Sequence, residues 1–188
     1  MLPSSDTPYI PSERSEDRLP ISAGIELCLR TYHARDRRDV LWLYHHGLLT
    51  GRADPSDPAT DLDQIEQFYL QRPQDHFWVA EMEGEVIGTV AILVDEKQIA
   101  HVRRLRVDPA WKTWRGGEVA RMLIQTATHH ARQHDCLKLV LHTPVDDERA
   151  IAFLHLLGFE YAGTRQLRGR HLLEFYLNLY SRPDRRIA

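Results

Sequence analysis

The sequence predicts a mixed α/β (α+β) domain, and two observations support this class. Runs with the two-residue period of strands and runs with the period of helices succeed one another in the order β-α-α-β-β-β-α-β-α-β-β. The stretch CLKLVLHT, residues 136–143, is almost continuously apolar, which is typical of a strand in the middle of a sheet. We therefore expect one sheet that is covered by helices.

The first half of the chain predicts two helices and three strands. Ile25, Leu27 and Leu29 recur at every second position, as in a half-buried strand. Thr60 or Asp61 is expected to cap a helix, because short polar side chains accept hydrogen bonds from the first backbone N–H groups. The elements expected are a strand over 24–32, a helix over 34–51, a helix over 60–71 and a hairpin over 76–96 that turns at EGE.

The second half predicts four strands and two helices. In IAHVRRLRVDP, Leu105 and Val107 alternate cleanly, but the preceding VRR breaks the period and indicates a bulge. A stripe of apolar residues at helical spacing predicts a helix directly after this strand. The elements expected are a strand over 99–109, a helix over 117–134, a strand over 136–143, a helix over 146–158 and a hairpin over 159–180.

Composition sets the domain organisation and narrows the partners. The 188 residues suffice for one domain, which we place at residues 21–181, between a disordered N-terminal extension (1–20) and a flexible tail (182–188). The net charge of −3 gives no electrostatic case for nucleic acid or a membrane surface. Two distant cysteines in apolar runs, and a polar start without a signal peptide, predict buried free thiols and a cytoplasmic protein.

The stretch RLRVDPAWKTWRGGEVARML, residues 104–123, is the strongest local signal. A strand ends at Asp-Pro, a basic turn with two glycines follows, and a helix begins at once. The first backbone N–H groups of a helix favour anions, and glycines let a phosphate approach them closely. Taken alone, the stretch is either a phosphate cradle or a plain turn. It matches neither the dinucleotide-binding nor the P-loop glycine pattern.

Three stretches in this order resemble the GNAT superfamily of acyl-CoA N-acyltransferases, over roughly residues 23–180. They are RLRVDPAW…RGGEVARML, LKLVLHTPVDDERAIAFLHLLGFEYAG and HFWVAEMEGEVIGTVAILV. The resemblance implies a central mixed, mostly antiparallel twisted sheet of about seven strands flanked by four helices. It also implies acetyl-CoA as the acyl donor and an amine-bearing small molecule or peptide as the acceptor. No metal is expected.

The resemblance also indicates where acetyl-CoA binds. The bulged strand would pair with the pantetheine arm, and the glycine turn would hold the pyrophosphate, although Trp114 and Val119 stand where the family has Gln or Arg and Gly or Ala. Asp147 stands where many members contact the cofactor arm, and it is also placed to cap a helix. The cofactor-binding candidates are Leu105, Arg106, Val107, Lys112, Trp114, Arg115, Gly116, Gly117, Glu118, Val119 and Asp147.

Catalysis requires that an amine lose a proton before it attacks the thioester. His142, at the end of the central strand, is the leading candidate for the base, and a half-buried histidine satisfied by backbone is the alternative. His101, on the preceding strand, is the second candidate. Many family members have a tyrosine acid before the GF turn, but here Leu154 stands there, and the neighbouring His155 would point about 100° away.

Two functions are therefore carried forward. The first is an acetyl-CoA-dependent N-acetyltransferase that acts on a primary amine by direct attack in a ternary complex. The second is a GNAT-like module that binds CoA, or has lost it, and acts in sensing or interaction. The closing strand HLLEFYLNLY is apolar enough to pair across a homodimer or to be used wholly by its own domain. The acceptor itself is not readable from loop sequences.

Overall fold

The computed structural model describes residues 17–19, 27–47, 59–111, 117–167 and 169–180. It contains one eight-stranded mixed sheet in the order β1-β2-β3-β4-β5-β6-β8-β7, in which only β5 and β6 are parallel neighbours. The strands are β1 (Asp17–Leu19), β2 (Leu27–Thr31), β3 (His76–Met82), β4 (Glu85–Val94), β5 (Ile99–Val107), β6 (Lys138–Pro144), β7 (Glu160–Leu167) and β8 (Arg170–Asn178).

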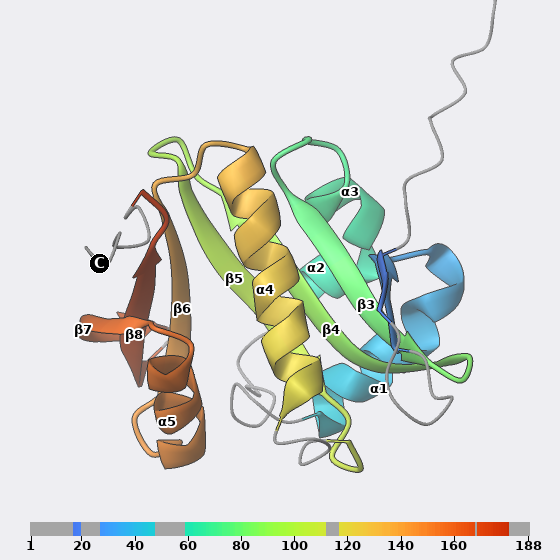
Figure 1. The fold of residues 1–188 in the computed structure, drawn as a ribbon. Coiled ribbons are helices and arrows are strands. Elements are labelled where there is room, and N and C mark those ends of the chain that lie inside the picture. Colours follow the sequence, from blue (N-terminus) through green and yellow to red (C-terminus); the bar gives the residue numbers. More distant parts are fainter. Residues whose placement is uncertain (1–16, 20–26, 48–58, 112–116, 168, 181–188) are drawn as a thin grey trace, which may run out of the picture.

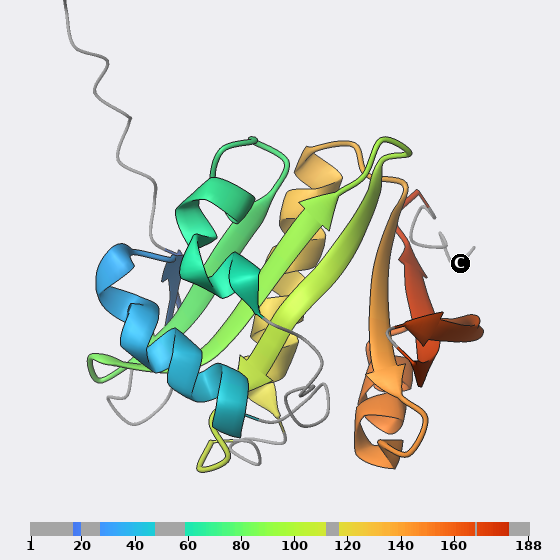
Figure 2. The same ribbon diagram turned by 180° about the vertical axis from the view of Figure 1, so that it is seen from behind.

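Helices cover both faces of this sheet (Figures 1 and 2). The helices are η1 (Ala34–Asp36), α1 (Arg37–His46), α2 (Thr60–Asp63), α3 (Ile65–Tyr69), α4 (Glu118–Gln133) and α5 (Glu148–Leu156). One core, centred on Leu105, Leu123 and Leu139, lies under α4 and α5. A second core, centred on Leu43, Ile65 and Phe77, lies under α1 to α3. The predicted mixed fold is confirmed.

The structure differs from the predicted element count in three places. The helix expected over 34–51 is divided into the 3-10 helix η1 and α1, and α1 already ends at His46. Three residues within the stretch 1–20 form the edge strand β1, which adds an eighth strand. The helix predicted over 60–71 is divided into α2 and α3, because Gln64 leaves the helical region with φ −139° and ψ 51°. Its N-cap is Ala59, so neither Thr60 nor Asp61 caps it. The tail 182–188 lies outside the described residues.

Helices α4 and α5 end through the same backbone arrangement. At the end of α4, Asp135 is left-handed with φ 56°, and the Cys136 N–H donates to Ala131 O at 2.9 Å. At the end of α5, Gly158 has φ 83°, and the Phe159 N–H donates to Leu154 O at 3.0 Å. Each contact binds a terminal carbonyl and turns the chain back toward the sheet. The chain therefore enters β6 and β7 in a defined direction.

Candidate active site

The sheet opens between β5 and β6, and this opening forms the candidate site. Residues Ile99, Ala100 and His101 pair with Lys138, Leu139 and Val140, and no further register pair joins the two described strands. Figures 1 and 2 show the strands separating toward their carboxyl ends. Backbone groups on the β5 edge beyond His101 therefore face the opening instead of a neighbouring strand.

The predicted bulge lies in β5 at the start of the opening. Register runs from Thr89 opposite Arg106 to Ala91 opposite Arg103, so one residue of β4 faces two of β5. Arg104 has a left-handed φ of 53°, and its carbonyl accepts a 2.7 Å hydrogen bond from the Thr89 hydroxyl. A bulge re-aims a strand and its side chains. The bulge of β5 interrupts the regular β4–β5 ladder beside Leu105, Arg106 and Val107, the residues that the sequence analysis expects to pair with the cofactor arm.

The side chains of that segment are not exposed to the opening. Leu105 and Val107 belong to the core under α4. Arg106 is buried toward α1, where its guanidinium lies 5.8 Å from the Tyr44 ring centre and donates to Leu105 O at 3.0 Å. The side chains of these three residues therefore belong to the two cores and do not line the opening between β5 and β6.

The start of α4 is a helix N-terminus, whose first backbone N–H groups have no partner within the helix. Gly117 is the N-cap, with a left-handed φ of 86° that disfavours side chains. Glu118 lies in the first turn and Val119 is fully buried in the core, so Val119 can offer only its N–H. Four other predicted phosphate ligands, Lys112, Trp114, Arg115 and Gly116, lie outside the described residues.

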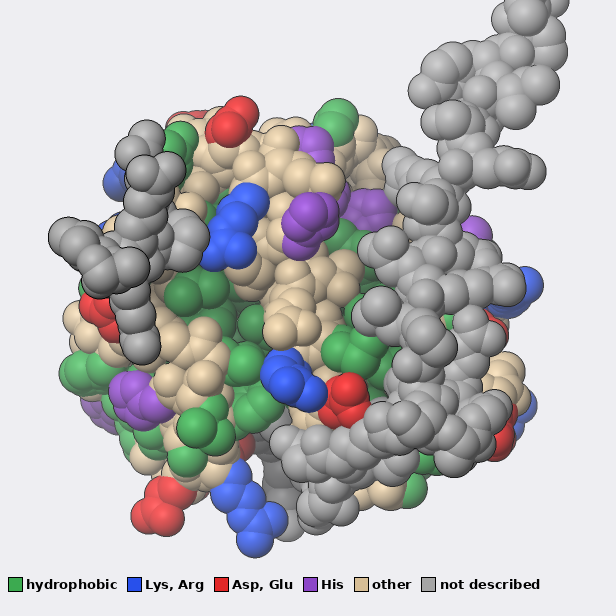
Figure 3. All heavy atoms as spheres, in the orientation of Figure 1, with side chains coloured by type: hydrophobic (Ala, Val, Ile, Leu, Met, Phe, Trp, Pro, Cys, Tyr) green, Lys and Arg blue, Asp and Glu red, His purple; other side chains and the backbone are tan. Residues whose placement is uncertain are grey.

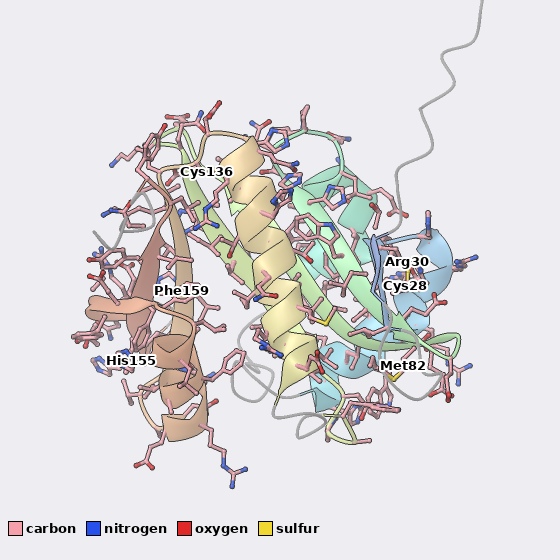
Figure 4. The ribbon with its side chains drawn as sticks, viewed as in Figure 1. Cys28, Arg30, Met82, Cys136, His155 and Phe159 are labelled. Atoms are coloured by element: carbon pink, nitrogen blue, oxygen red, sulfur yellow. The ribbon has the colours of Figure 1, made fainter. Side chains whose placement is uncertain are left out.

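Asp147 is the N-cap of α5, and its carboxylate accepts a 3.0 Å hydrogen bond from the Ala150 N–H. Of the two roles considered for it, the structure therefore shows the capping role. Leu154 is buried in the core, so the tyrosine position near the opening carries no acid. His155 packs edge-on against Phe175 at 5.3 Å between ring centres, and Figure 4 shows it on α5 beside β8.

The two candidate catalytic histidines share one face of the sheet. Along β6, Leu139 and Leu141 point into the core under α4, so His142 points to the opposite face. His101 stands opposite Val140 in the parallel register and so faces the same side. His142 is half-buried, and its Nε2 atom lies 3.1 Å from Glu174 of β8. His101 is more exposed and pairs with Asp95 at 3.1 Å.

Burial lowers the pKa of His142, and the Glu174 carboxylate opposes this shift only in part. His142 is therefore neutral near neutral pH, which is the state that can accept a proton. The partner of His142 is a side chain, not the backbone group considered from the sequence. Sequence reasoning missed Glu174 because it lies 32 residues away and carries no local motif.

A second carboxylate joins α2 to the bulge on the same face as Arg106. Asp61 is bound by the guanidinium of Arg104, with the Nε–Oδ2 pair at 2.8 Å, and by the hydroxyl of Tyr69. Burial alone would raise the pKa of Asp61, but these hydrogen bonds outweigh it and the pKa lies below its ordinary value. Arg104 also lies 5.1 Å from the Tyr44 ring centre.

Other polar features lie away from the opening. A hollow of about 370 Å³, lined by Arg30, Asp36 and Glu81, lies at β2 and the β3–β4 turn. Arg30, labelled in Figure 4, donates hydrogen bonds to Asp36 Oδ2 and Glu81 Oε2, both at 2.6 Å. Three strands lie between β2 and β6 in the sheet, so the hollow is not part of the site.

Histidines gather on the face that α4 covers (Figure 3), where His130 stacks between His76 and His134 at 5.2 and 4.4 Å. Among the described residues, no group of three or more His, Cys, Asp or Glu side chains is placed to hold a metal ion. Cys28 and Cys136 are free thiols and lie far apart (Figure 4). No helix in the described part is long and apolar enough to span a membrane.

Comparison with known proteins agrees with this geometry. The family described as "Acetyltransferase (GNAT) family" matches residues 38–159. The chain is 32% identical to mouse N-acetylaspartate synthetase over 145 residues. The aligned segment covers 77% of this chain and 43% of the mouse protein. The chain is also 34% identical to human N-acetyltransferase 8B over 109 residues. This aligned segment covers 55% of this chain and 47% of the human protein. The chain thus spans less than half the length of these relatives.

Solved structures show the same fold. An acetyltransferase from Streptococcus agalactiae superposes with a TM-score of 0.70 at 18% identity, covering 81% of this chain and 98% of that one. A putative acetyltransferase from Salmonella typhimurium with its cofactor acetyl-CoA superposes with a TM-score of 0.65 at 19% identity, covering 84% and 96%. The opened sheet, the bulged β5 and the match over residues 38–159 together show that the chain belongs to the acetyltransferase (GNAT) family.

Proposed function

We propose that the protein is an acetyl-CoA-dependent N-acetyltransferase that acts on a primary amine by direct attack in a ternary complex. The observation that supports this most strongly is the opening between β5 and β6, with the bulge on one side and the N-terminus of α4 at its end. A pantetheine arm would pair with backbone groups of β5 beyond His101, where the register with β6 ends. The pyrophosphate would meet the first N–H groups of α4.

The site residues would then divide the chemistry. Backbone N–H groups between Leu105 and Val107 would stabilise the oxyanion that forms on the thioester carbonyl. Neutral His142 would take the proton of the ammonium group before attack. With Leu154 in place of an acid, the CoA thiolate would leave unassisted, since a thiol pKa of about 8.5 makes it a fair leaving group.

The charges on the α1–α3 face favour an acceptor that carries a carboxylate. Arg103, Arg104 and Arg106 lie within four consecutive positions of β5, and the nearby Asp61 carboxylate feels the charge of both Arg103 and Arg104. Of these arginines, Arg103 is exposed, so its guanidinium can attract an anionic acceptor. The name of the mouse relative, N-acetylaspartate synthetase, is consistent with such an acceptor.

The cofactor proposal is tested by thermal unfolding with and without acetyl-CoA, in a pair of glycine variants. Acetyl-CoA at 100 times its Kd should add about 2.7 kcal/mol to the stability of the wild type. Gly117→Ala should reduce this gain, because it alters the start of α4. Gly84→Ala is the matched control, since the φ of Gly84, 85°, is close to the 86° of Gly117, but Gly84 lies in the β3–β4 turn. No gain at millimolar acetyl-CoA would contradict the proposal.

The acceptor proposal is tested by acetyl-transfer rates with a panel of amines that includes aspartate, glutamate and spermidine. The acidic amino acids should have the higher kcat/KM. Arg103→Gln should raise KM for them and narrow their advantage over spermidine. A preference for the polyamine in the wild type would show that the arginines of β5 do not select the acceptor.

A further inference from the structure

Three side chains on neighbouring strands form one hydrogen-bonded group beside the opening. Glu174 of β8 stands opposite His142 of β6 in the antiparallel register, and β7 pairs with the other edge of β8. The Oε2 atom of Glu174 lies 3.1 Å from His142 Nε2 and 3.0 Å from Arg165 Nε. Arg165 also donates from Nη2 to Oε1 at 3.2 Å. Both carboxylate oxygens are therefore engaged.

This arrangement determines which ring nitrogen of His142 carries the proton. The hydrogen bond from Arg165 is the main cause that keeps the pKa of Glu174 below its ordinary value, so the carboxylate is ionised. An ionised carboxylate only accepts hydrogen bonds, so the Nε2 atom of His142 must be the donor. In a neutral imidazole the lone pair then lies on Nδ1. Within the described part of the chain, no hydrogen bond to this Nδ1 is present.

Three charged or titratable groups act on His142 from the strands around it. Glu174 of β8 raises the pKa of His142, whereas His101 of β5 and Arg165 of β7 lower it. Burial is the largest cause and lowers it as well. The imidazolium that forms during proton transfer is consequently held by one carboxylate in an environment that otherwise disfavours it. The Glu174 carboxylate therefore stabilises the imidazolium of His142, as the carboxylate does in other pairs of a histidine base and a carboxylate.

We propose that Glu174 is a positioning residue that sets the tautomer and orientation of His142, and that Arg165 in turn fixes Glu174. This inference rests on the proposed acetyltransferase function. In the first step the substrate ammonium gives one proton to Nδ1 of His142, and the Nε2–H bond to Glu174 stabilises the imidazolium. The free amine then attacks the thioester carbonyl, so that a C–N bond forms and the C–S bond breaks.

The proton balance closes without any further reactant. After it has left, the thiolate of CoA takes the proton that His142 holds, and the second proton of the amine nitrogen passes to solvent. The products are the amide, CoA with a free thiol and one released proton. His142 returns to its neutral form with Nε2 again bound to Glu174. Neither Glu174 nor Arg165 changes its protonation state in the cycle.

The test uses the purified full chain, its best amine acceptor and pH profiles of kcat/KM. Glu174→Gln should lower kcat/KM about tenfold, a part of the effect of general-base catalysis. It should also move the acidic limb to lower pH, because the carboxylate that raises the pKa of His142 is gone. Arg165→Met should move that limb to higher pH, because its charge lowers the same pKa. A purely structural role would not produce opposite shifts.

A double variant shows whether Glu174 acts through His142. His142→Gln alone should remove the acidic limb, and Glu174→Gln should add no further loss in the His142→Gln background. Independent, multiplying losses would overturn the inference, and so would a Glu174→Gln profile identical to that of the wild type. If the wild type transfers acetyl groups and each variant still binds acetyl-CoA, either of these results contradicts only the role inferred for Glu174 and not the proposed function. A wild type inactive with every amine would contradict the proposed function instead.

Discussion

Two carboxylates of this protein make almost the same contacts in two different settings. Asp61 is held between Arg104 and the Tyr69 hydroxyl, and Glu174 is held between Arg165 and His142. The side chains of Asp61 and Arg104 are 12% and 8% exposed, whereas Arg165 is 63% exposed and His142 is 25% exposed. The first group is largely buried, and the second retains an exposed guanidinium and a partly exposed imidazole.

The difference shows how burial divides structural from chemical roles. A buried pair is costly to break, because the remaining charge is left without compensation. An exposed pair contributes little to stability, but it can fix the protonation state of a neighbour. The Asp61 group therefore joins α2 to the bulge of β5. The Glu174 group engages Nε2 of His142, which under the proposed function would leave Nδ1 to accept a proton.

The largest expected effect comes from breaking the closed group. Asp61→Ala leaves Arg104 buried without its carboxylate and should cost about 3–5 kcal/mol of unfolding free energy. Asp63→Ala is the matched control on the same helix, because Asp63 forms an exposed pair with Arg37 and should cost less than about 1 kcal/mol. Urea denaturation measures both. Equal losses in the two variants would show that the Asp61 group does not hold α2 to the sheet.

A smaller effect is expected from pH. The folded-state pKa of Asp61 lies below 3.8, so its stabilising contribution is present above that value and is lost as pH falls through the folded pKa. Asp61→Asn cannot titrate. The difference in unfolding free energy between wild type and Asp61→Asn should therefore narrow between about pH 5 and pH 2. Urea denaturation at each pH measures this difference. If it stayed constant across the range, the titration of Asp61 would not contribute to the pH dependence of stability.

The smallest effect on stability is expected at the open group. Arg165→Met removes an exposed partner of Glu174, so the urea midpoint should stay within experimental error of the wild type. The same variant should still move the pH profile of the reaction. This combination is what distinguishes the Glu174 group from the Asp61 group. A large loss of stability in Arg165→Met would mean that both groups serve the fold.

Local sequence patterns predicted most of the fold, but they did not predict which side chains pair with Asp61 and Glu174. The helix expected over 117–134 lies at Glu118–Gln133, and the broken period at VRR predicted the bulge at Arg104. Asp61 and Arg104 are 43 residues apart, and only the packed sheet brings them together. The same is true of His142 and Glu174. Sequence reasoning found His142 because of its place at the end of a strand, but it had no signal for the partner.

The three-pair junction between β5 and β6 also has a consequence for how the sheet moves. Strands β2 to β5 form long antiparallel ladders, and β6, β8 and β7 form another, but few backbone hydrogen bonds join the two blocks. Units that share few such bonds can open separately from the whole protein. Amides of β6 to β8 are thus expected to exchange with solvent as one cooperative unit, distinct from β3 and β4. The opening would then be a boundary between two exchange units.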